Sequence, residues 1–201
     1  MQAASSEFKM DLASLPTRDY LDMLASEKPS PGGGSAAALC AATGAALVEM
    51  ASRINSKRVK NENKEDSLRN AKKMPPIRKK LLDLMTLDAQ AYEKLAEHWK
   101  NKSPQLDGLL AEACQVPLDI AGLSLQALEI GATEIPRTSP SLMSDLMEAG
   151  AILYNSFQSA LLHVEVNLKA MKNESFILKT RRRVADATAQ AEHFYEAFRQ
   201  G

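Results

Sequence analysis

A proline- and glycine-rich loop that leads directly into a stretch of small residues constrains this chain more than any other segment. The loop reads Lys28-Pro29-Ser30-Pro31-Gly32-Gly33-Gly34-Ser35, and Ala36–Ala42 follows it without a break. Proline disfavours helix in the residue before it, and glycine permits backbone angles that are closed to other residues. Ser35 is therefore predicted to be the N-cap of a helix whose alanines let another backbone come very close.

A bare loop at the start of a helix collects unpaired backbone N–H groups and the positive end of the helix dipole in one place. Such a place suits an anion or the polar edge of a ligand. The spacing fits neither a Walker loop, which needs a lysine after the glycines, nor the dinucleotide fingerprint, which needs a preceding strand. A plain turn between two helices is the alternative. The candidate ligand-binding residues are Pro31, Gly32, Gly33, Gly34 and Ser35.

Along the rest of the chain, apolar residues recur at three- and four-residue spacing, and the alternation typical of strands is absent. This pattern predicts an all-α protein, an up-and-down multi-helix bundle. Pro75-Pro76 is expected to open the third helix, and Pro117 to kink the fourth. A flexible leader over 1–16 and one helical domain over 17–201 are expected. The helices are expected from Thr17, over 35–58, 77–100, 104–131, 141–172 and 177–199.

The fifth of these helices is the longest and most apolar, which favours a homodimer formed through long helices. Its polar residues Asn155, Ser159, His163 and Asn167 are each four apart and form a line along it. Such groups either pair across a subunit interface or line a wet cleft. His163 has no second His or Cys spaced to share a metal ion, so no metal site is predicted, and a satisfied core histidine is the alternative.

Two charged residues stand out from their surroundings. Asp88 lies within the apolar stripe of the third helix, and a buried carboxylate needs donors from the protein or from a ligand. Lys57 ends the second helix, at the start of a densely charged stretch. A solvated helical face explains that stretch, and contact with the acidic tail of a ligand is the alternative.

The composition excludes several classes of protein. Lys and Arg balance Asp and Glu at 25 each, so no global field attracts nucleic acid or an anionic membrane. No apolar run approaches the roughly 18 residues that span a bilayer. Cys40 and Cys114 lie in apolar stretches without CxxC spacing, which favours reduced, buried thiols and a cytoplasmic protein.

Taken together, these segments resemble the cyclodeaminase domain of formiminotransferase-cyclodeaminase and the related bacterial methenyltetrahydrofolate cyclohydrolases. The resemblance covers most of residues 17–195, in order. It is carried by Pro29–Leu39, Met50–Lys57, Asp88–Tyr92, Val116–Ala121, Ser144-Asp145 and Leu161–Lys172. Its first and last segments are the most specific. The family is all-helical, self-associates and works on one-carbon tetrahydrofolates.

The resemblance implies closure of 5-formiminotetrahydrofolate to 5,10-methenyltetrahydrofolate with loss of ammonia, a step of histidine degradation. Asp88 and Asp145 are the catalytic candidates, because a desolvated carboxylate can relay protons and stabilise a developing cation. An ordinary helix cap or ion pair is the alternative for either residue, and above all for Asp145, which lies within the first turns of its helix. The substrate-binding candidates are the Pro31–Ser35 loop, Lys57, His163 and Asn167. No cofactor or metal is expected, and a separate formiminotransferase is a possible partner.

Three other functions stay open on the sequence. A cyclohydrolase would add water to the methenyl carbon and open the same ring. A catalytically silent helical scaffold would bind another enzyme. A nucleic-acid binder would use Arg181–Arg183, but aromatic residues are not interleaved with these arginines.

Overall fold

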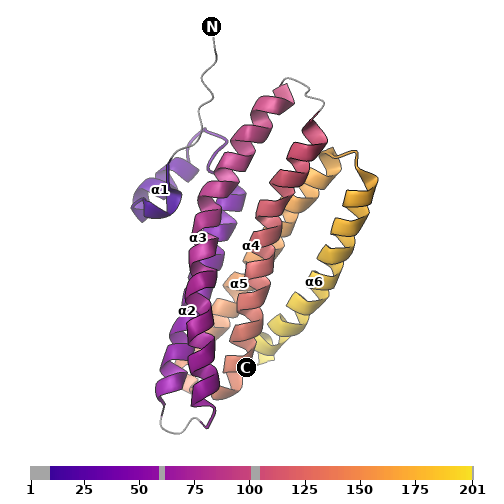
Figure 1. The fold of residues 1–201 in the computed structure, drawn as a ribbon. Helices are drawn as coiled ribbons and strands as arrows, with labels where there is room; N and C mark the ends of the chain where they lie inside the picture. Colours follow the sequence, from indigo (N-terminus) through magenta and orange to yellow (C-terminus); the bar gives the residue numbers. More distant parts are fainter. Residues whose placement is uncertain (1–9, 59–61, 101–104, 201) are drawn as a thin grey trace.

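The long helices run alternately up and down beside one another, as Figure 1 shows, and every regular element in the described residues is helical. The computed structural model describes residues 10–58, 62–100 and 105–200. The elements are η1 (Leu12–Ser14), α1 (Thr17–Leu24), α2 (Gly33–Lys57), α3 (Lys64–Lys100), α4 (Leu106–Glu134), η2 (Ile135–Arg137), α5 (Pro140–Ala170) and α6 (Glu174–Gln200). The predicted all-α up-and-down bundle is confirmed, and the homodimer stays a prediction.

Helix α2 packs closely in the bundle because its side chains are small. Ala38, Ala41 and Ala45 are fully buried, and α3, α4 and α5 all pack against this helix. At Gly44 the neighbouring helix is so near that a Cβ would lie 2.7 Å from Cγ of Leu153 on α5. This contact is made by a side chain, so the predicted close approach of another backbone stays a prediction.

Helix α2 begins earlier than predicted. Gly32 is the N-cap residue and Gly33 is the first helical residue, so Ser35 lies within the first turn. The Ser35 hydroxyl bonds to Tyr20 instead of capping the helix. The N-cap prediction for Ser35 is wrong, because glycine is itself an acceptable cap and lets the chain enter the helix sooner.

Pro75 and Pro76 lie inside α3, so the prediction that they open a separate helix is wrong. A proline in a helix interior costs about 3 kcal/mol through its missing N–H and its clash with a carbonyl. The flanking side chains of Met74 and Ile77 are buried in the main core, and their packing keeps the helix continuous. Helix α4 also continues through Pro117, and its predicted first residue, Pro104, lies outside the described residues.

Part of the expected leader is packed on the bundle. Leu12 is 1% exposed, and its backbone N–H donates to Oγ1 of Thr86 on α3 at 2.9 Å. The leader prediction is therefore wrong from residue 12 onward, because a buried leucine and a hydrogen bond anchor η1 to α3. Residues 1–9 lie outside the described residues.

The two cysteines lie in different environments. Cys114 is buried, and burial raises the pKa of its thiol to about 11, which keeps it protonated. Cys40 is exposed, so the prediction of a buried thiol is wrong there. It lies on the outer side of α2, away from the alanines that face the core.

Two segments, Gly33–Lys57 and Leu106–Arg137, are long and apolar enough to cross a membrane by length and composition alone. The sequence expectation that no apolar run approaches this length is therefore wrong. In the bundle, 61% of the apolar window of the first segment is buried, and 39% of that of the second. Core helices of bundles have the same composition, so the finding is weak support for a membrane span.

A buried carboxylate joins three helices at the end of the bundle where α2 stops. Glu134 of α4 is fully buried, and its Oε2 accepts from Asn55 of α2 and Ser67 of α3, each at 2.9 Å. Its Oε1 accepts from Asn70 of α3 at 2.7 Å and faces Arg137 at 3.4 Å. A carboxylate with this many donors is well compensated for its burial.

Replacing Glu134 with Ala is expected to lower the free energy of unfolding by about 3 kcal/mol or more, because it removes the shared acceptor of several buried donors. Denaturant unfolding followed by circular dichroism measures this. Glu129→Ala, an exposed position on the same helix, is the matched control and is expected to change stability by less than about 0.5 kcal/mol. A Glu134→Ala variant as stable as that control would contradict the structural role.

Candidate functional site

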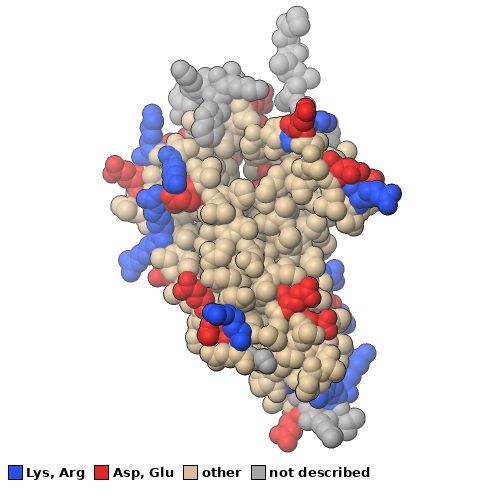
Figure 2. Space-filling view, turned by 180° about the vertical axis from the view of Figure 1, so that it is seen from behind, with Lys and Arg blue, Asp and Glu red and all other residues tan. Residues whose placement is uncertain are grey.

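A cleft of about 570 Å³ opens at the end of the bundle where α2 begins. Its polar part consists of Pro29, Ser30 and Gly32–Gly34 from the loop and first turn, together with Asp88 of α3 and His163 and Asn167 of α5. Its apolar walls are formed by Ala91, Tyr92, Leu95, Ala96, Ala113, Pro117 and Val166. Figure 2 shows the face behind that of Figure 1, largely free of charged residues over its middle and hollowed in its upper part. The cleft therefore combines mostly apolar walls with a few polar groups at one end.

The Asp88 carboxylate lies directly against the backbone of Gly34. A Cβ on Gly34 would lie 2.5 Å from Cγ and 2.7 Å from Oδ2 of Asp88, so only glycine leaves room for the carboxylate. The backbone N–H of Ser35, one residue further along the first turn, donates to Asp88. A carboxylate is thus held at the positive end of the α2 dipole.

Burial raises the pKa of the Asp88 carboxyl above its usual range. The charge of His163 and the hydrogen bond from the Ser35 backbone oppose this rise without cancelling it. The charged form of Asp88 is therefore disfavoured by burial but stabilised by His163 and by the Ser35 amide. Groups with this combination in a cleft are candidates for proton transfer.

His163 approaches the same turn from α5. A Cβ on Gly33 would lie 2.9 Å from its Nε2 and 3.1 Å from its Cε1. The missing side chain of Gly33 thus leaves room for the His163 imidazole, and that of Gly34 leaves room for the Asp88 carboxylate. The cleft brings an acid and a base from two helices to one helix N-terminus.

Two buried hydroxyl groups lie behind Asp88. The Tyr20 hydroxyl of α1 and Oγ of Ser35 are 3.2 Å apart, and both residues are buried. No sequence motif marked Tyr20 as part of a site. The spacing of the apolar residues in α1 identifies the buried face of this helix. It does not identify the partner of the Tyr20 hydroxyl, which lies 15 residues further along the chain, on the next helix.

The structure brings most of the sequence-predicted residues together. Gly32, Gly33, Gly34, Asp88, His163 and Asn167 all line the cleft. Ser35 lies just behind it and contacts Asp88 through its amide. Pro31 is buried and is not part of the cleft wall.

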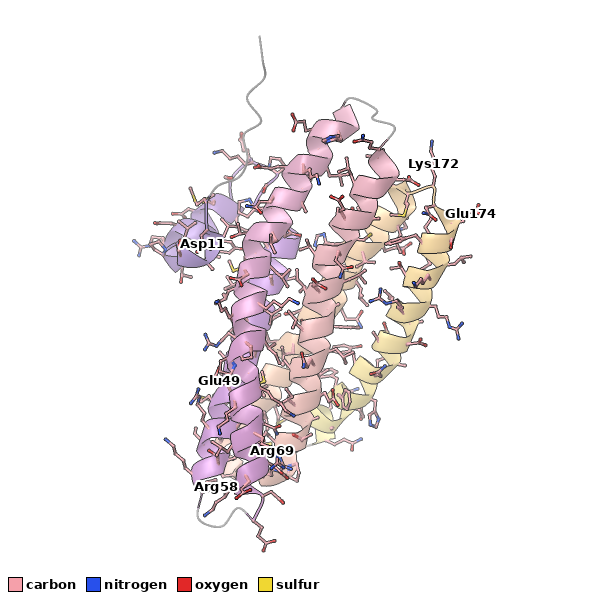
Figure 3. The ribbon with its side chains drawn as sticks, viewed as in Figure 1. Asp11, Glu49, Arg58, Arg69, Lys172 and Glu174 are labelled. Carbon is pink, nitrogen blue, oxygen red and sulfur yellow. The ribbon has the colours of Figure 1, made fainter. Side chains whose placement is uncertain are left out.

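Lys57 and Asp145 lie away from the cleft, so their predicted roles beside it find no support within one chain. Lys57 ends the helix that Gly33 begins, about 36 Å away at roughly 1.5 Å per residue. Asp145 lies about 27 Å from His163 along α5 by the same measure. In Figure 3, Arg58 and Lys172, which follow the far end of α2 and the near end of α5, mark opposite ends of the bundle. The sequence predicted the helix ends near which both residues lie, but not how far those ends are from the cleft.

The polar line on α5 divides into two parts. His163 and Asn167 line the cleft, whereas Asn155 is exposed and donates to the Ala151 carbonyl of its own helix at 2.8 Å. The wet-cleft interpretation therefore holds for its C-terminal half. Among the described residues, no group of three or more His, Cys, Asp or Glu side chains is arranged to hold a metal ion.

Asp88→Asn is expected to be more stable than the parent near neutral pH. A raised folded-state pKa gives stability that is fully present below the unfolded pKa and is lost as pH rises through the folded pKa. Asparagine cannot ionise, so the gain should shrink as pH falls toward about 3.9, the ordinary aspartate value. Denaturant unfolding over a pH series measures it. Asp83→Asn, exposed on the same helix, is the control, and a gain that does not change with pH would contradict the assignment.

The family model described as formiminotransferase-cyclodeaminase matches residues 16–186 of this chain. A methenyltetrahydrofolate cyclohydrolase of Methylorubrum extorquens is 27% identical over 192 residues, which cover 88% of this chain and 92% of that protein. The formimidoyltransferase-cyclodeaminase of Rattus norvegicus is 28% identical over 188 residues, or 87% of this chain. The chain spans only 34% of that rat protein.

The solved structures give the same relationship. The crystal structure of formiminotetrahydrofolate cyclodeaminase from Thermotoga maritima matches with a TM-score of 0.90 and 28% identity, over 93% of this chain and 95% of that one. The relatives named here are enzymes that, by name, act on one-carbon derivatives of folate. Because the family match covers most of its length, this chain belongs to the formiminotransferase-cyclodeaminase family, as the sequence resemblance predicted.

Proposed function

We propose that this protein is a formiminotetrahydrofolate cyclodeaminase, which converts 5-formiminotetrahydrofolate to 5,10-methenyltetrahydrofolate and ammonia. The observation that carries the proposal is the meeting of Asp88 and His163 at the bare first turn of α2, inside an otherwise apolar cleft. The Thermotoga maritima relative, which shares the fold over nearly its whole length, supports this choice of reaction.

The cleft suits a flat ring system with one polar edge. Its apolar walls, including Tyr92 and Pro117, can cover the faces of a pterin. The side chain of Asn167 and the backbone of the Gly32–Gly34 turn can hydrogen-bond the polar edge. The reacting formimino group would then lie near Asp88 and His163.

The reaction needs one bond formed, one bond broken and two proton movements. N10 of the folate attacks the formimino carbon, and the C–N bond to the departing nitrogen breaks. The formimino group reacts as its protonated amidinium form. When N10 loses its proton and the departing nitrogen gains one, ammonia leaves and the positive charge of the amidinium stays on the product ring. Neither electron transfer nor a difficult nucleophile is involved, so the proposal includes no metal or organic cofactor.

Asp88 and His163 can share these roles. The Asp88 carboxylate accepts the N10 proton and stabilises the developing cation. The His163 imidazole, on the other side of the same turn, passes a proton to the departing nitrogen.

A cyclohydrolase is the second candidate, favoured by the Methylorubrum extorquens relative, which matches over nearly its full length. In that reaction the same pair would activate a water molecule that attacks the methenyl carbon. The bound cation and the carboxylate are common to both reactions.

The two reactions are distinguished by incubating the purified chain with each folate and following the methenyl absorbance and ammonia release. We expect methenyl product and stoichiometric ammonia from 5-formiminotetrahydrofolate. Decay of the methenyl compound faster than the buffer blank, without ammonia formation from the formimino compound, would favour the cyclohydrolase. Activity in neither assay, with no tetrahydrofolate binding by calorimetry, would leave the scaffold interpretation.

Asp88→Asn is expected to lower kcat by about 100-fold or more, because it removes the proton acceptor. Asp145→Asn is expected to keep parental turnover, since its carboxylate lies at the far end of α5. Steady-state kinetics on both variants checks this, with helical content followed by circular dichroism. A large loss in Asp145→Asn would instead indicate that a second copy of the chain completes the cleft.

Gly34→Ala is expected to reduce turnover about as strongly as Asp88→Asn, because the added Cβ displaces the Asp88 carboxylate. Gly122→Ala, on α4, is the matched control, since its Cβ meets no atom within 4 Å. Comparison of kcat for the two variants makes the test. Parental kcat in Gly34→Ala would remove Asp88 from the proposed site.

A further inference from the structure

We propose that Tyr20 is a positioning residue, which acts through Ser35 to hold the Asp88 carboxylate in its working place. The inference rests on the proposed function for its catalytic consequence, but its structural core is a chain of contacts from α1 through α2 to α3. Of the residues that make these contacts, only Asp88 is a catalytic candidate from the sequence.

Tyr20 is the residue of α1 that is buried against the bundle. Of the eight residues of this described helix, Tyr20 is the only buried one, at 2% exposed, whereas Leu21 beside it is 50% exposed. The Tyr20 hydroxyl lies 3.2 Å from Oγ of Ser35, which is fully buried on α2. A short helix that is otherwise largely exposed therefore places one phenol behind the first turn of α2.

Ser35 connects Tyr20 to Asp88 through two contacts. Its hydroxyl bonds to Tyr20, while its backbone N–H donates to the Asp88 carboxylate. The bare Gly34 lies between these groups and offers no side chain to brace the carboxylate. The bond to Tyr20 is thus a described side-chain contact that holds the Ser35 turn.

Tyr20 supplies a hydrogen bond and no charge. Burial raises the pKa of its phenol, and the charges of Cys40 and Asp88 raise it further, against the effect of the Ser35 hydrogen bond. The phenol therefore stays neutral at working pH. The other groups that face Asp88 are His163 from α5 and the Ser35 amide, while α4 contributes the uncharged Ala113 and Pro117 to the cleft.

Tyr20→Phe removes the hydroxyl and keeps the ring, so α1 can still dock. With Ser35 less firmly held, its amide supports the Asp88 carboxylate less, and the pKa of Asp88 should rise further. We expect kcat to fall about tenfold with KM within about twofold, which is less than the loss of the proton acceptor itself. The acidic limb of the kcat–pH profile should move to higher pH.

The test measures kinetics and the Asp88 titration in the same variants. The Asp88 carboxyl carbon is followed by NMR across pH in the parent, Tyr20→Phe and Ser35→Ala, with Asp88→Asn identifying its signal. Tyr195→Phe, which removes the hydroxyl of a half-buried tyrosine outside the cleft, is the matched control. The proposal expects a higher Asp88 pKa in both test variants and no change in Tyr195→Phe.

A purely structural role for Tyr20 predicts a different result. Stability would fall while the Asp88 titration and the kcat–pH profile kept their parental positions, and that outcome overturns the proposal. If Tyr20→Phe does not fold, Ser35→Ala breaks the same bond from the other side and decides alone. If the parent turns over neither folate, the proposed function fails, and the NMR titration still tests the Tyr20–Asp88 connection.

Discussion

The contact between the Asp88 carboxylate and the bare backbone of Gly34 is the constraint on which the cleft depends. A carboxylate can lie that close only where no Cβ intervenes, and it is stable there only because the first turn of α2 presents an amide and a positive dipole end. The helix N-terminus that could have held an external anion already holds one from the protein. The cleft is therefore suited to a ligand that carries or develops positive charge, which is the requirement of a reaction whose product is a cation.

The sequence predicted the fold well because apolar residues at three- and four-residue spacing indicate helices, and small residues indicate where helices can pack closely. It predicted Gly32–Gly34, Asp88, His163 and Asn167 as site residues, and these lie together. Lys57 and Asp145 do not, because each lies near the end of its helix that is far from the cleft, and a matched motif position carries no information on that distance. Tyr20 was missed for a related reason, since a buried tyrosine is explained by packing until the partner of its hydroxyl is known.

The bundle keeps the Glu134 cluster and the candidate site at separate ends. The Glu134 cluster satisfies a buried carboxylate with donors from α2 and α3, so its charge stabilises the fold. Asp88 has fewer donors, and burial raises its pKa, so the same kind of group lowers the stability of the fold when it is charged. The fully buried Glu134 and the partly buried Asp88 therefore differ in how far hydrogen-bond donors compensate the burial of their carboxylates.

Helix α3 connects these two ends without interruption, across Pro75 and Pro76. Asn70, which serves the Glu134 cluster, and Asp88, which serves the cleft, are separated by about five helical turns, so both point to the same side of one rod. Gaining or losing a single residue between them would swing one of these side chains by about 100° relative to the other. Between these two positions the length of the segment is thus more tightly constrained than the identity of its exposed side chains.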